Sequence, residues 1–456
     1  MKSLCAGHRL SLMKRLPDGL ILLSGEIETP RNSDINYPFR QNSNFIYLTG
    51  VQDPDFHVLL DPRSGRSTLF IPRIDAEHKV WLGPIPGPAQ CRKLYGFSRI
   101  AYADELPAHF RKARKGSRRC YANPAAAKTF PKLASFKKKD TDTLLDALEE
   151  LRALKSDGEL GFIRAASRTA EQAHRSAMLR ALPGMREYEV QALFDGECLR
   201  RGLKHLAFPS IVAAGANSAI LHYVRNDALL RKGQLVLLDA GAECLGYASD
   251  ITRTFPVDRH FSQRQRDVYS IVLEAQKACI RQVRAGALST DLHRLSMTVI
   301  AEGLKSLGIL KGDACGLVEN GAVKLFYPHG IGHLMGLDVH DGRGGKKRHM
   351  ENPGKVPIRF VAKLEAGFVL TVEPGIYFID ALLMDPAQRA KHKGSVDFSK
   401  AERFLDFGGV RIEDDLLVRK NGYENLTDSR VCPKEIPQIE ELRAQAFAQA
   451  GRKARV

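Results

Sequence analysis

The stretch VLLDAGAECLGYASDITRTF, residues 236–255, carries two aspartates, Asp239 and Asp250. Its apolar start and its β-branched end are typical of two strands, with the turn of a hairpin expected at residues 244–246. Simple pairing of this hairpin places Asp239 directly opposite Asp250. Because facing carboxylates repel each other unless a cation or a shared proton lies between them, this pairing favours a metal site. On the hairpin alone, two solvated turn residues are an equally good interpretation.

A second stretch, YPHGIGHLMGLDVHD at residues 327–341, adds imidazoles to these carboxylates. His329, His333 and His340 lie in one glycine-rich run, which argues against a regular helix and for closely approaching backbone. A single histidine would be interpreted as an ordinary core or surface residue. Three histidines accompanied by two aspartates favour metal ligands instead.

Two glutamates lie in apolar, strand-like runs: Glu373 in FVLTVEPGIYF and Glu413 in FGGVRIEDDLLV. Carboxylates are rarely left inside such runs unless they are paired or bind a metal. A salt bridge, for example between Glu413 and Arg411, is therefore one possibility and metal ligation is the other. Five residues can coordinate a cation through a carboxylate oxygen or an imidazole nitrogen. These candidate metal ligands are Asp239, Asp250, His333, Glu373 and Glu413.

This ligand set indicates a dinuclear site. Its four carboxylates would neutralise two divalent cations, and its oxygen-rich character favours Mn²⁺ over the Cys- and His-rich sites typical of zinc. Two metals about 3.5–4 Å apart can share a water and polarise a carbonyl oxygen. The sequence therefore predicts a hydrolase with two divalent metal ions, with Mn²⁺ preferred.

The chain resembles the pita-bread metallopeptidases of the proline-directed branch, which contains prolidase and aminopeptidase P. Four motifs carry the resemblance, in this order: DAG with SDITRTF, HGIGHLMGLDVHD, TVEPG and GGVRIED. YPFRQNSNFIYLTG and STLFIPRID are similar to the amino-terminal domain of that branch, so the resemblance covers nearly the whole chain. It implies an α+β fold, with a pita-bread catalytic domain preceded by a smaller α/β amino-terminal domain. It also implies that Asp239 and Asp250 ligate one metal, that His333 ligates the other, and that Asp250, Glu373 and Glu413 bind or bridge.

The same resemblance assigns catalytic and substrate roles. His222 and His340 match histidines that contact the scissile carbonyl or the proline and help to stabilise the tetrahedral intermediate. Glu373 matches the general base. His329 and Asp341 belong to the motif but receive no role.

Three features favour prolidase, an Xaa-Pro dipeptidase, over aminopeptidase P, which acts on longer peptides. They are the segment GIYFIDALL, the forty-residue interval between Glu373 and Glu413, and Arg359, which would hold the terminal carboxylate of a dipeptide. Arg411 is a further expected substrate-binding residue. Prolidase is thus the main prediction, and aminopeptidase P is the alternative.

A non-catalytic binding protein of the same fold is a less favoured alternative, because all five ligand positions carry coordinating groups. One departure from the family pattern is Phe208 in FPSIVAAG, where relatives commonly have a tyrosine whose hydroxyl lies near the metal centre. Phenylalanine keeps the ring and loses the donor, which predicts a slower enzyme.

The length of 456 residues allows two or more domains. We expect an amino-terminal domain at 1–150, a catalytic domain at 151–435 and a helical, basic tail at 436–456. The formal net charge of +17 and the run RKARKGSRR at 111–119 invite a nucleic-acid interpretation. Since no recognised nucleic-acid module accompanies the charge, a solvated basic surface is favoured.

The eight cysteines are dispersed without a disulfide-like spacing. The amino-terminal segment matches neither a signal peptide nor a membrane span. These features predict reduced thiols in a cytoplasmic protein without a membrane partner. The resemblance further implies a homodimer or higher homo-oligomer that acts on proline-containing peptides.

Overall fold

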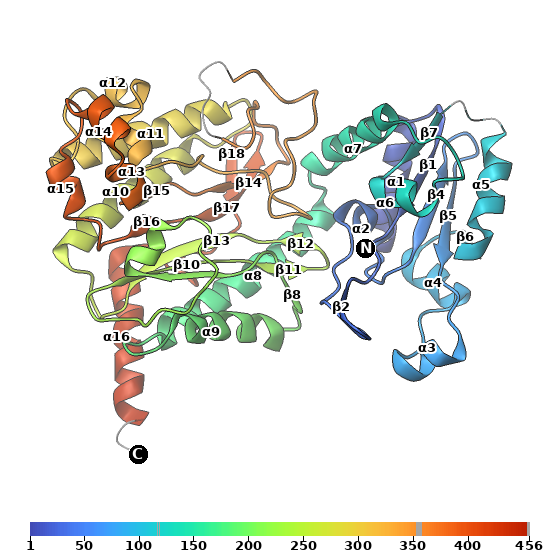
Figure 1. Cartoon of the computed structure of the whole chain (residues 1–456), viewed down its shortest axis with the longest axis horizontal. Coiled ribbons are helices and arrows are strands. Elements are labelled where there is room, and N and C mark those ends of the chain that lie inside the picture. Colours follow the sequence, from blue (N-terminus) through green and yellow to red (C-terminus); the bar gives the residue numbers. More distant parts are fainter. Residues whose placement is uncertain (116, 118, 353–357, 454–456) are drawn as a thin grey trace. The chain divides into compact units, whose positions relative to one another are not determined.

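The computed structural model describes residues 1–115, 117, 119–352 and 358–453 (Figure 1). Arg118 of the basic run and residues 454–456 of the expected tail lie outside this range. The chain divides into two compact units between Arg152 and Ala153, with Gly345–Lys347 grouped with the first unit. Both units combine helices with sheets, which confirms the α+β class.

The first unit is built on a five-stranded sheet of order β6-β5-β4-β1-β7. The interior strand β1, which pairs with β4 and β7, is buried along its whole length, as expected for a strand covered on both faces. A core cluster on one face includes Leu20, Phe70 and Phe110. The strands are β1 (Gly19–Ser24), β2 (Pro30–Asn32), β3 (Ile35–Asn36), β4 (His57–Asp61), β5 (Arg66–Ile71), β6 (Arg99–Tyr102) and β7 (Arg119–Ala122).

The helices of this unit flank the sheet and its connections (Figure 1). Asn42 and Asn123 cap two of them by accepting hydrogen bonds from backbone N–H groups of the first turn. The helices are α1 (Lys2–Arg15), α2 (Ser43–Thr49), α3 (Ala76–Trp81), α4 (Pro88–Tyr95), the 3₁₀ turn η1 (Ala103–Glu105), α5 (Leu106–Arg114), α6 (Pro124–Thr129) and α7 (Lys138–Ala153).

The second unit carries several small sheets, and two of them meet at the candidate site. The sheet of order β13-β10-β9 is joined to the sheet of order β14-β17-β18 by a bridge between Thr252 and Glu413. The strands are β8 (His205–Leu206), β9 (Ile211–Ala214), β10 (Leu235–Ala240), β11 (Ala242–Cys244), β12 (Tyr247–Ala248), β13 (Ile251–Pro256), β14 (Val369–Val372), β15 (Gly375–Tyr377), β16 (Gly409–Arg411), β17 (Asp414–Arg419) and β18 (Gly422–Asn425).

Helices pack against these sheets and bury a large apolar core (Figure 1). The segment expected as a tail forms α16, and its Ile439 and Leu442 belong to this core. No helix in the described part of the chain is long and apolar enough to cross a membrane. The helices are α8 (Asp157–Arg180), α9 (Glu187–Arg200), η2 (Gly215–Ala219), α10 (Gln263–Gln282), α11 (Ser289–Ser306), α12 (Ala314–Glu319), η3 (Ala322–Leu325), α13 (Asp380–Leu383), α14 (Pro386–His392), α15 (Phe398–Glu402) and α16 (Ile436–Lys453).

The predicted hairpin is present, but its register differs from the prediction. Asp239 pairs with Thr252 and does not face Asp250. The reason is the turn: Leu245 and Gly246 both have positive φ, 51° and 92°, and form a two-residue turn that shifts the pairing by two residues. Asp239 and Asp250 are consequently diagonal neighbours, which still lets both carboxylates line one pocket.

Candidate metal centre

One pocket of about 380 Å³ in the second unit brings the predicted site residues together. It lies where the β10–β13 hairpin, the loop before β14 and the start of β17 converge. Phe208 and His329 also line it. All nine residues predicted to bind metal or substrate line this pocket: His222, Asp239, Asp250, His333, His340, Arg359, Glu373, Arg411 and Glu413.

The centre of the pocket is a buried cluster of potential ligand atoms. One such atom from each of Asp250, His333 and Glu413 lies within 4.8 Å of the others. His333 Nε2 is 3.3 Å from Asp250 Oδ2 and 3.5 Å from Glu373 Oε1. This spacing allows one cation to contact several of these groups at once.

Two threonines hold the ligand side chains in place. Thr252 Oγ1 donates a hydrogen bond to Glu413 Oε2 at 2.7 Å. Thr371 Oγ1 donates to Glu373 Oε1 at 3.2 Å and accepts from the backbone N–H of His333 at 3.1 Å. Such outer contacts orient metal ligands and tune their affinity. Sequence analysis missed both threonines, although each lies two residues from a predicted ligand.

Two glycines of the motifs are required by close backbone approach. A Cβ on Gly241 would lie 1.8 Å from the carbonyl oxygen of Ser249, and a Cβ on Gly332 would lie 2.0 Å from that of Thr371. Both positions therefore exclude any larger side chain. The expectation of closely approaching backbone in the histidine-rich run is confirmed at Gly332.

Arg411 has a different partner from the one considered in the sequence. Its guanidinium donates a 2.6 Å hydrogen bond to Asp239 Oδ2, rather than forming a hydrogen-bonded salt bridge with Glu413. It also donates to the hydroxyls of Tyr377, at 2.8 Å, and Thr252, at 3.2 Å. Arg411, at the end of β16, thus contacts Asp239 on β10, and the salt bridge considered with Glu413 is replaced by this one.

The protonation behaviour of the carboxylates fits a cation site. Burial raises the pKa of Glu373 to about 7. Burial, reinforced by neighbouring carboxylates, also raises the pKa values of Asp250 and Glu413 above their usual range. Among the described residues, the Oδ1 atoms of Asp239 and Asp250 are buried and accept no hydrogen bond. A divalent cation would satisfy these oxygens and remove the repulsion.

The environment of His333 and His340 favours the neutral form of both imidazoles. Burial lowers the pKa of His333 to about 3. Loss of solvent around part of the ring, reinforced by the charge of Arg359, lowers the pKa of the more exposed His340 to about 4. A neutral imidazole can bind a metal or accept a hydrogen bond through an unprotonated nitrogen. The two rings meet edge to face with centroids 4.3 Å apart.

The two motif residues without an assigned role, His329 and Asp341, differ in their contacts. His329 Nε2 is hydrogen bonded to the Tyr377 hydroxyl at 2.8 Å, and its Nδ1 lies 3.8 Å from Glu373 Oε2. Asp341 does not line the pocket and accepts a 3.0 Å hydrogen bond from the buried Lys155. Asp341 thus holds the histidine-rich loop to the segment that precedes α8.

Comparison with known proteins places this site in a family. The model of metallopeptidase family M24 matches residues 161–420, and that of the aminopeptidase P N-terminal domain matches residues 5–121. The chain belongs to metallopeptidase family M24. This assignment confirms the predicted pita-bread metallopeptidase of the proline-directed branch, and membership of M24 implies the binding of divalent metal.

Two relatives resemble this chain over most of its length. Probable Xaa-Pro aminopeptidases of Fusarium vanettenii and Verticillium alfalfae are each 37% identical to it. The alignments cover 90% of this chain and 89% of the first relative, and 92% of this chain and 92% of the second. These names agree with the predicted alternative better than with prolidase.

Solved aminopeptidase structures also agree with this alternative. Aminopeptidase PepP of Pseudomonas aeruginosa superimposes with a TM-score of 0.84 at 33% identity. Aminopeptidase P of E. coli with the inhibitor Pro-Leu gives a TM-score of 0.84 at 32% identity. Each comparison covers 98% of this chain and 99% of the other. The two-domain architecture implied by the sequence motifs is therefore that of an aminopeptidase P.

Proposed function

We propose that this protein is an Xaa-Pro aminopeptidase, which removes the first residue of peptides that have proline in the second position. The observation that carries the proposal is the convergence of all nine predicted residues in one pocket, in a chain that resembles Xaa-Pro aminopeptidases over about nine-tenths of its length. The features that favoured prolidase are one short segment, one interval and one arginine. They weigh less than similarity along the whole chain.

The metal centre is proposed to hold two divalent cations, with Mn²⁺ preferred, through Asp239, Asp250, His333, Glu373 and Glu413. Support comes from the four carboxylates, which balance two divalent charges, and from the mainly oxygen donor set. When bound, such a pair supplies Lewis-acid activation of a peptide carbonyl and of a water nucleophile. An E. coli aminopeptidase P structure is described as zinc-substituted, so the identity of the metal is part of the proposal.

The remaining roles fall to side chains around this centre. Glu373 is proposed as the general base, because the family resemblance gives it this role and its carboxylate lines the pocket, with Oε1 3.5 Å from His333 Nε2. His222 and His340 are exposed and line the pocket, so they can contact the substrate carbonyl. Arg359 is also exposed, and Arg411 contacts Asp239. We assign both arginines to substrate binding, with Arg411 also orienting Asp239.

A cytoplasmic homo-oligomer is the proposed state of the enzyme. The eight cysteines are all free thiols, consistent with a reducing compartment. Val80, Trp81 and Leu82 are consecutive exposed apolar residues, with 66% to 79% of their surface accessible. Such an apolar patch on the amino-terminal unit supports contact with another subunit.

Substrate length tests the activity. Purified enzyme supplied with Mn²⁺ should cleave Ala-Pro-Ala with a higher kcat/KM than Ala-Pro, and a chelator should abolish both reactions until Mn²⁺ is restored. The Glu373→Gln variant is the matched control, because any cleavage it retains does not come from this site. A preference for the dipeptide would restore the prolidase assignment. Full activity of metal-free protein would contradict the metal centre.

A further inference from the structure

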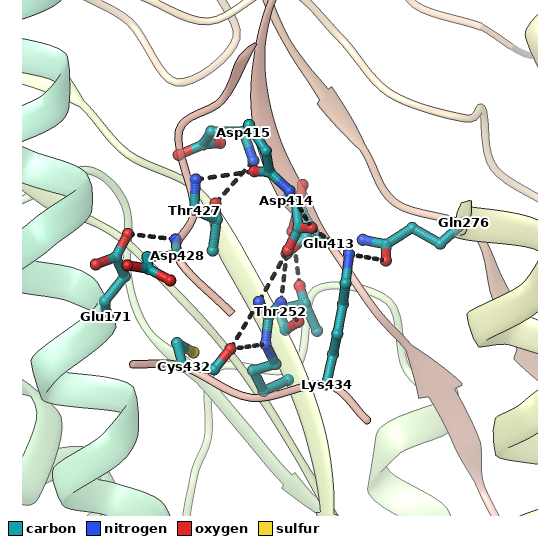
Figure 2. Close-up of polar contacts among 12 residues, drawn as sticks. Glu171, Thr252, Gln276, Glu413, Asp414, Asp415, Thr427, Asp428, Cys432 and Lys434 are labelled. Carbon is teal, nitrogen blue, oxygen red and sulfur yellow. Dashed lines mark hydrogen bonds and ion pairs between the residues drawn. The ribbon is translucent and has the colours of Figure 1, made fainter. Parts of the chain in front are cut away.

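A buried network of charged side chains surrounds Asp414, the residue that follows the proposed ligand Glu413 (Figure 2). Asp414 Oδ1 accepts a 2.8 Å hydrogen bond from Arg253, and Asp414 Oδ2 accepts one from Lys434. Lys434 also donates to Gln276 Oε1 at 2.8 Å. The side chains of Arg253 and Asp414 are fully buried, and that of Lys434 is 8% exposed. None of these residues lines the pocket.

Arg253 connects this network to the backbone that carries the ligands. Its guanidinium donates to the carbonyl oxygen of Glu413 at 2.7 Å and to that of Thr252 at 3.0 Å. It also donates twice to the carbonyl oxygen of Cys432, at 3.1 Å each. The N–H of Glu413 in turn donates to the Thr252 carbonyl at 3.1 Å. One side chain thus binds three backbone segments that meet directly behind Glu413.

The chemistry of the guanidinium explains why an arginine suits this position. Its planar fork presents five N–H donors in fixed directions, whereas a lysine offers three donors on a flexible stem. These contacts hold β13 and β17 in register. Each strand directly follows a proposed metal ligand, Asp250 before β13 and Glu413 before β17. A shift between the strands would move the two carboxylates relative to each other.

We infer that Arg253 is a positioning residue of the metal centre, held in place by Asp414 and Lys434, and that it sets the affinity for divalent cations. Cys432 and Lys434, which lie in the segment leading into α16, are therefore part of the support of the site. This inference rests on the proposed function only in requiring that the cluster bind metal. Loss of an outer partner of metal ligands typically weakens binding about 10- to 100-fold.

A general role in folding is the competing explanation, and Arg443 provides the matched control. Arg443 is also fully buried, and it donates to the carbonyl oxygens of Met178, Ala181 and Val257 at 2.5 to 2.8 Å. It contacts none of the proposed ligands through these bonds. Arg443→Lys and Arg253→Lys therefore lose comparable buried hydrogen bonds and keep the charge, but only Arg253→Lys disturbs the ligand backbone.

The experiment is calorimetric titration of metal-free protein with Mn²⁺, below the melting temperature of every variant. Arg253→Lys should raise the Mn²⁺ dissociation constant about 10- to 100-fold, whereas Arg443→Lys should stay within about twofold of the wild type. Equal weakening in both variants, or wild-type affinity in Arg253→Lys, would overturn the inference. A wild-type protein that binds no Mn²⁺ would instead contradict the proposed metal centre itself.

If Arg253→Lys does not fold, the same Mn²⁺ titration of Lys434→Met tests whether the network positions the ligands. Removal of a positive charge near a cation site should by itself tighten Mn²⁺ binding through electrostatics. Loss of the support for Asp414, and through it for Arg253, should weaken binding. We expect weaker binding, by about tenfold. Unchanged or tighter binding would show that the network does not position the ligands.

Discussion

Arg411 and Asp239 form a hydrogen-bonded ion pair of 2.6 Å inside the pocket, with side chains only 5% and 12% exposed. Arg411 bonds the Oδ2 atom of Asp239, and Oδ1 accepts no hydrogen bond from the described residues. In Arg411→Met the carboxylate would be buried without a compensating charge. We expect this variant to destabilise the metal-free protein by about 3–5 kcal/mol. The loss should be smaller at saturating Mn²⁺, because the cation neutralises Asp239.

Denaturant unfolding of the variant with and without Mn²⁺ measures this difference. The control is Arg225→Met, which breaks an ion pair with Asp227 whose side chains are 78% and 52% exposed. That change should cost less than about 1 kcal/mol in either condition. An Arg411→Met penalty that is the same with and without Mn²⁺ would show that Asp239 is not a metal ligand.

The parts of the fold that depend on local chemistry could be predicted from the sequence. The hairpin strands and the turn near Leu245 follow from apolar, β-branched and turn residues within twenty positions. The register could not, because it depends on a positive φ at Leu245, a residue that rarely adopts this conformation. The predicted register was therefore wrong by two residues, and it paired Asp239 with Asp250 where the structure pairs Asp239 with Thr252.

In the candidate site, too, some residues could be predicted from the sequence and others could not. Its lining residues carry motifs, and the structure gathers them in one pocket. The support of the site could not be predicted, although Arg253 and Asp414 lie within the quoted motifs. Arg253 and Lys434 find partners about 160 positions away, at Glu413 and Gln276, through the tertiary fold alone. Periodicity and spacing contain no signal for such contacts. Substrate length also escaped prediction, since an exposed Arg359 fits both alternatives.

Phe208 lines the pocket at a position where the family resemblance led us to expect a tyrosine. A hydroxyl there would add one donor toward the charge that develops in the transition state, typically about 0.5–1.5 kcal/mol. We expect Phe208→Tyr to raise kcat on Ala-Pro-Ala about 2- to 10-fold, measured under saturating Mn²⁺. Unchanged or reduced turnover would mean that this pocket does not use the missing hydroxyl.

Replacement of Arg359 should affect the cleavage of dipeptides and of longer peptides to different extents. A dipeptidase would use it to bind the terminal carboxylate, so Arg359→Ala would lower kcat/KM for Ala-Pro by about 10- to 150-fold. For the proposed aminopeptidase we expect less than about a tenfold loss on Ala-Pro-Ala, because contacts with an exposed arginine are screened by water. The ratio of the two losses, measured on one protein preparation, is the informative quantity. A loss confined to the dipeptide would favour prolidase.

Glu171 predicts how stability depends on pH. It is 3% exposed, and its Oε1 accepts a 2.8 Å hydrogen bond from the N–H of Asp428 (Figure 2). Burial raises the pKa of Glu171 to about 7. The carboxyl therefore prefers to be protonated in the folded state, and the stability associated with it is fully present below about pH 4.3, the unfolded pKa. That stability is lost as the pH rises through about 7.

The Glu171→Gln variant removes this titration while keeping an oxygen for the Asp428 N–H. It should therefore be more stable than the wild type at alkaline pH, and its advantage should be about 1–2 kcal/mol larger at pH 8 than at pH 5, after allowance for screening. Denaturant unfolding at the two pH values measures the difference. Glu274→Gln is the control, because Glu274 is 55% exposed and should change stability equally at both pH values. If wild type and Glu171→Gln lose stability in parallel between pH 5 and pH 8, the buried carboxyl does not titrate in this range.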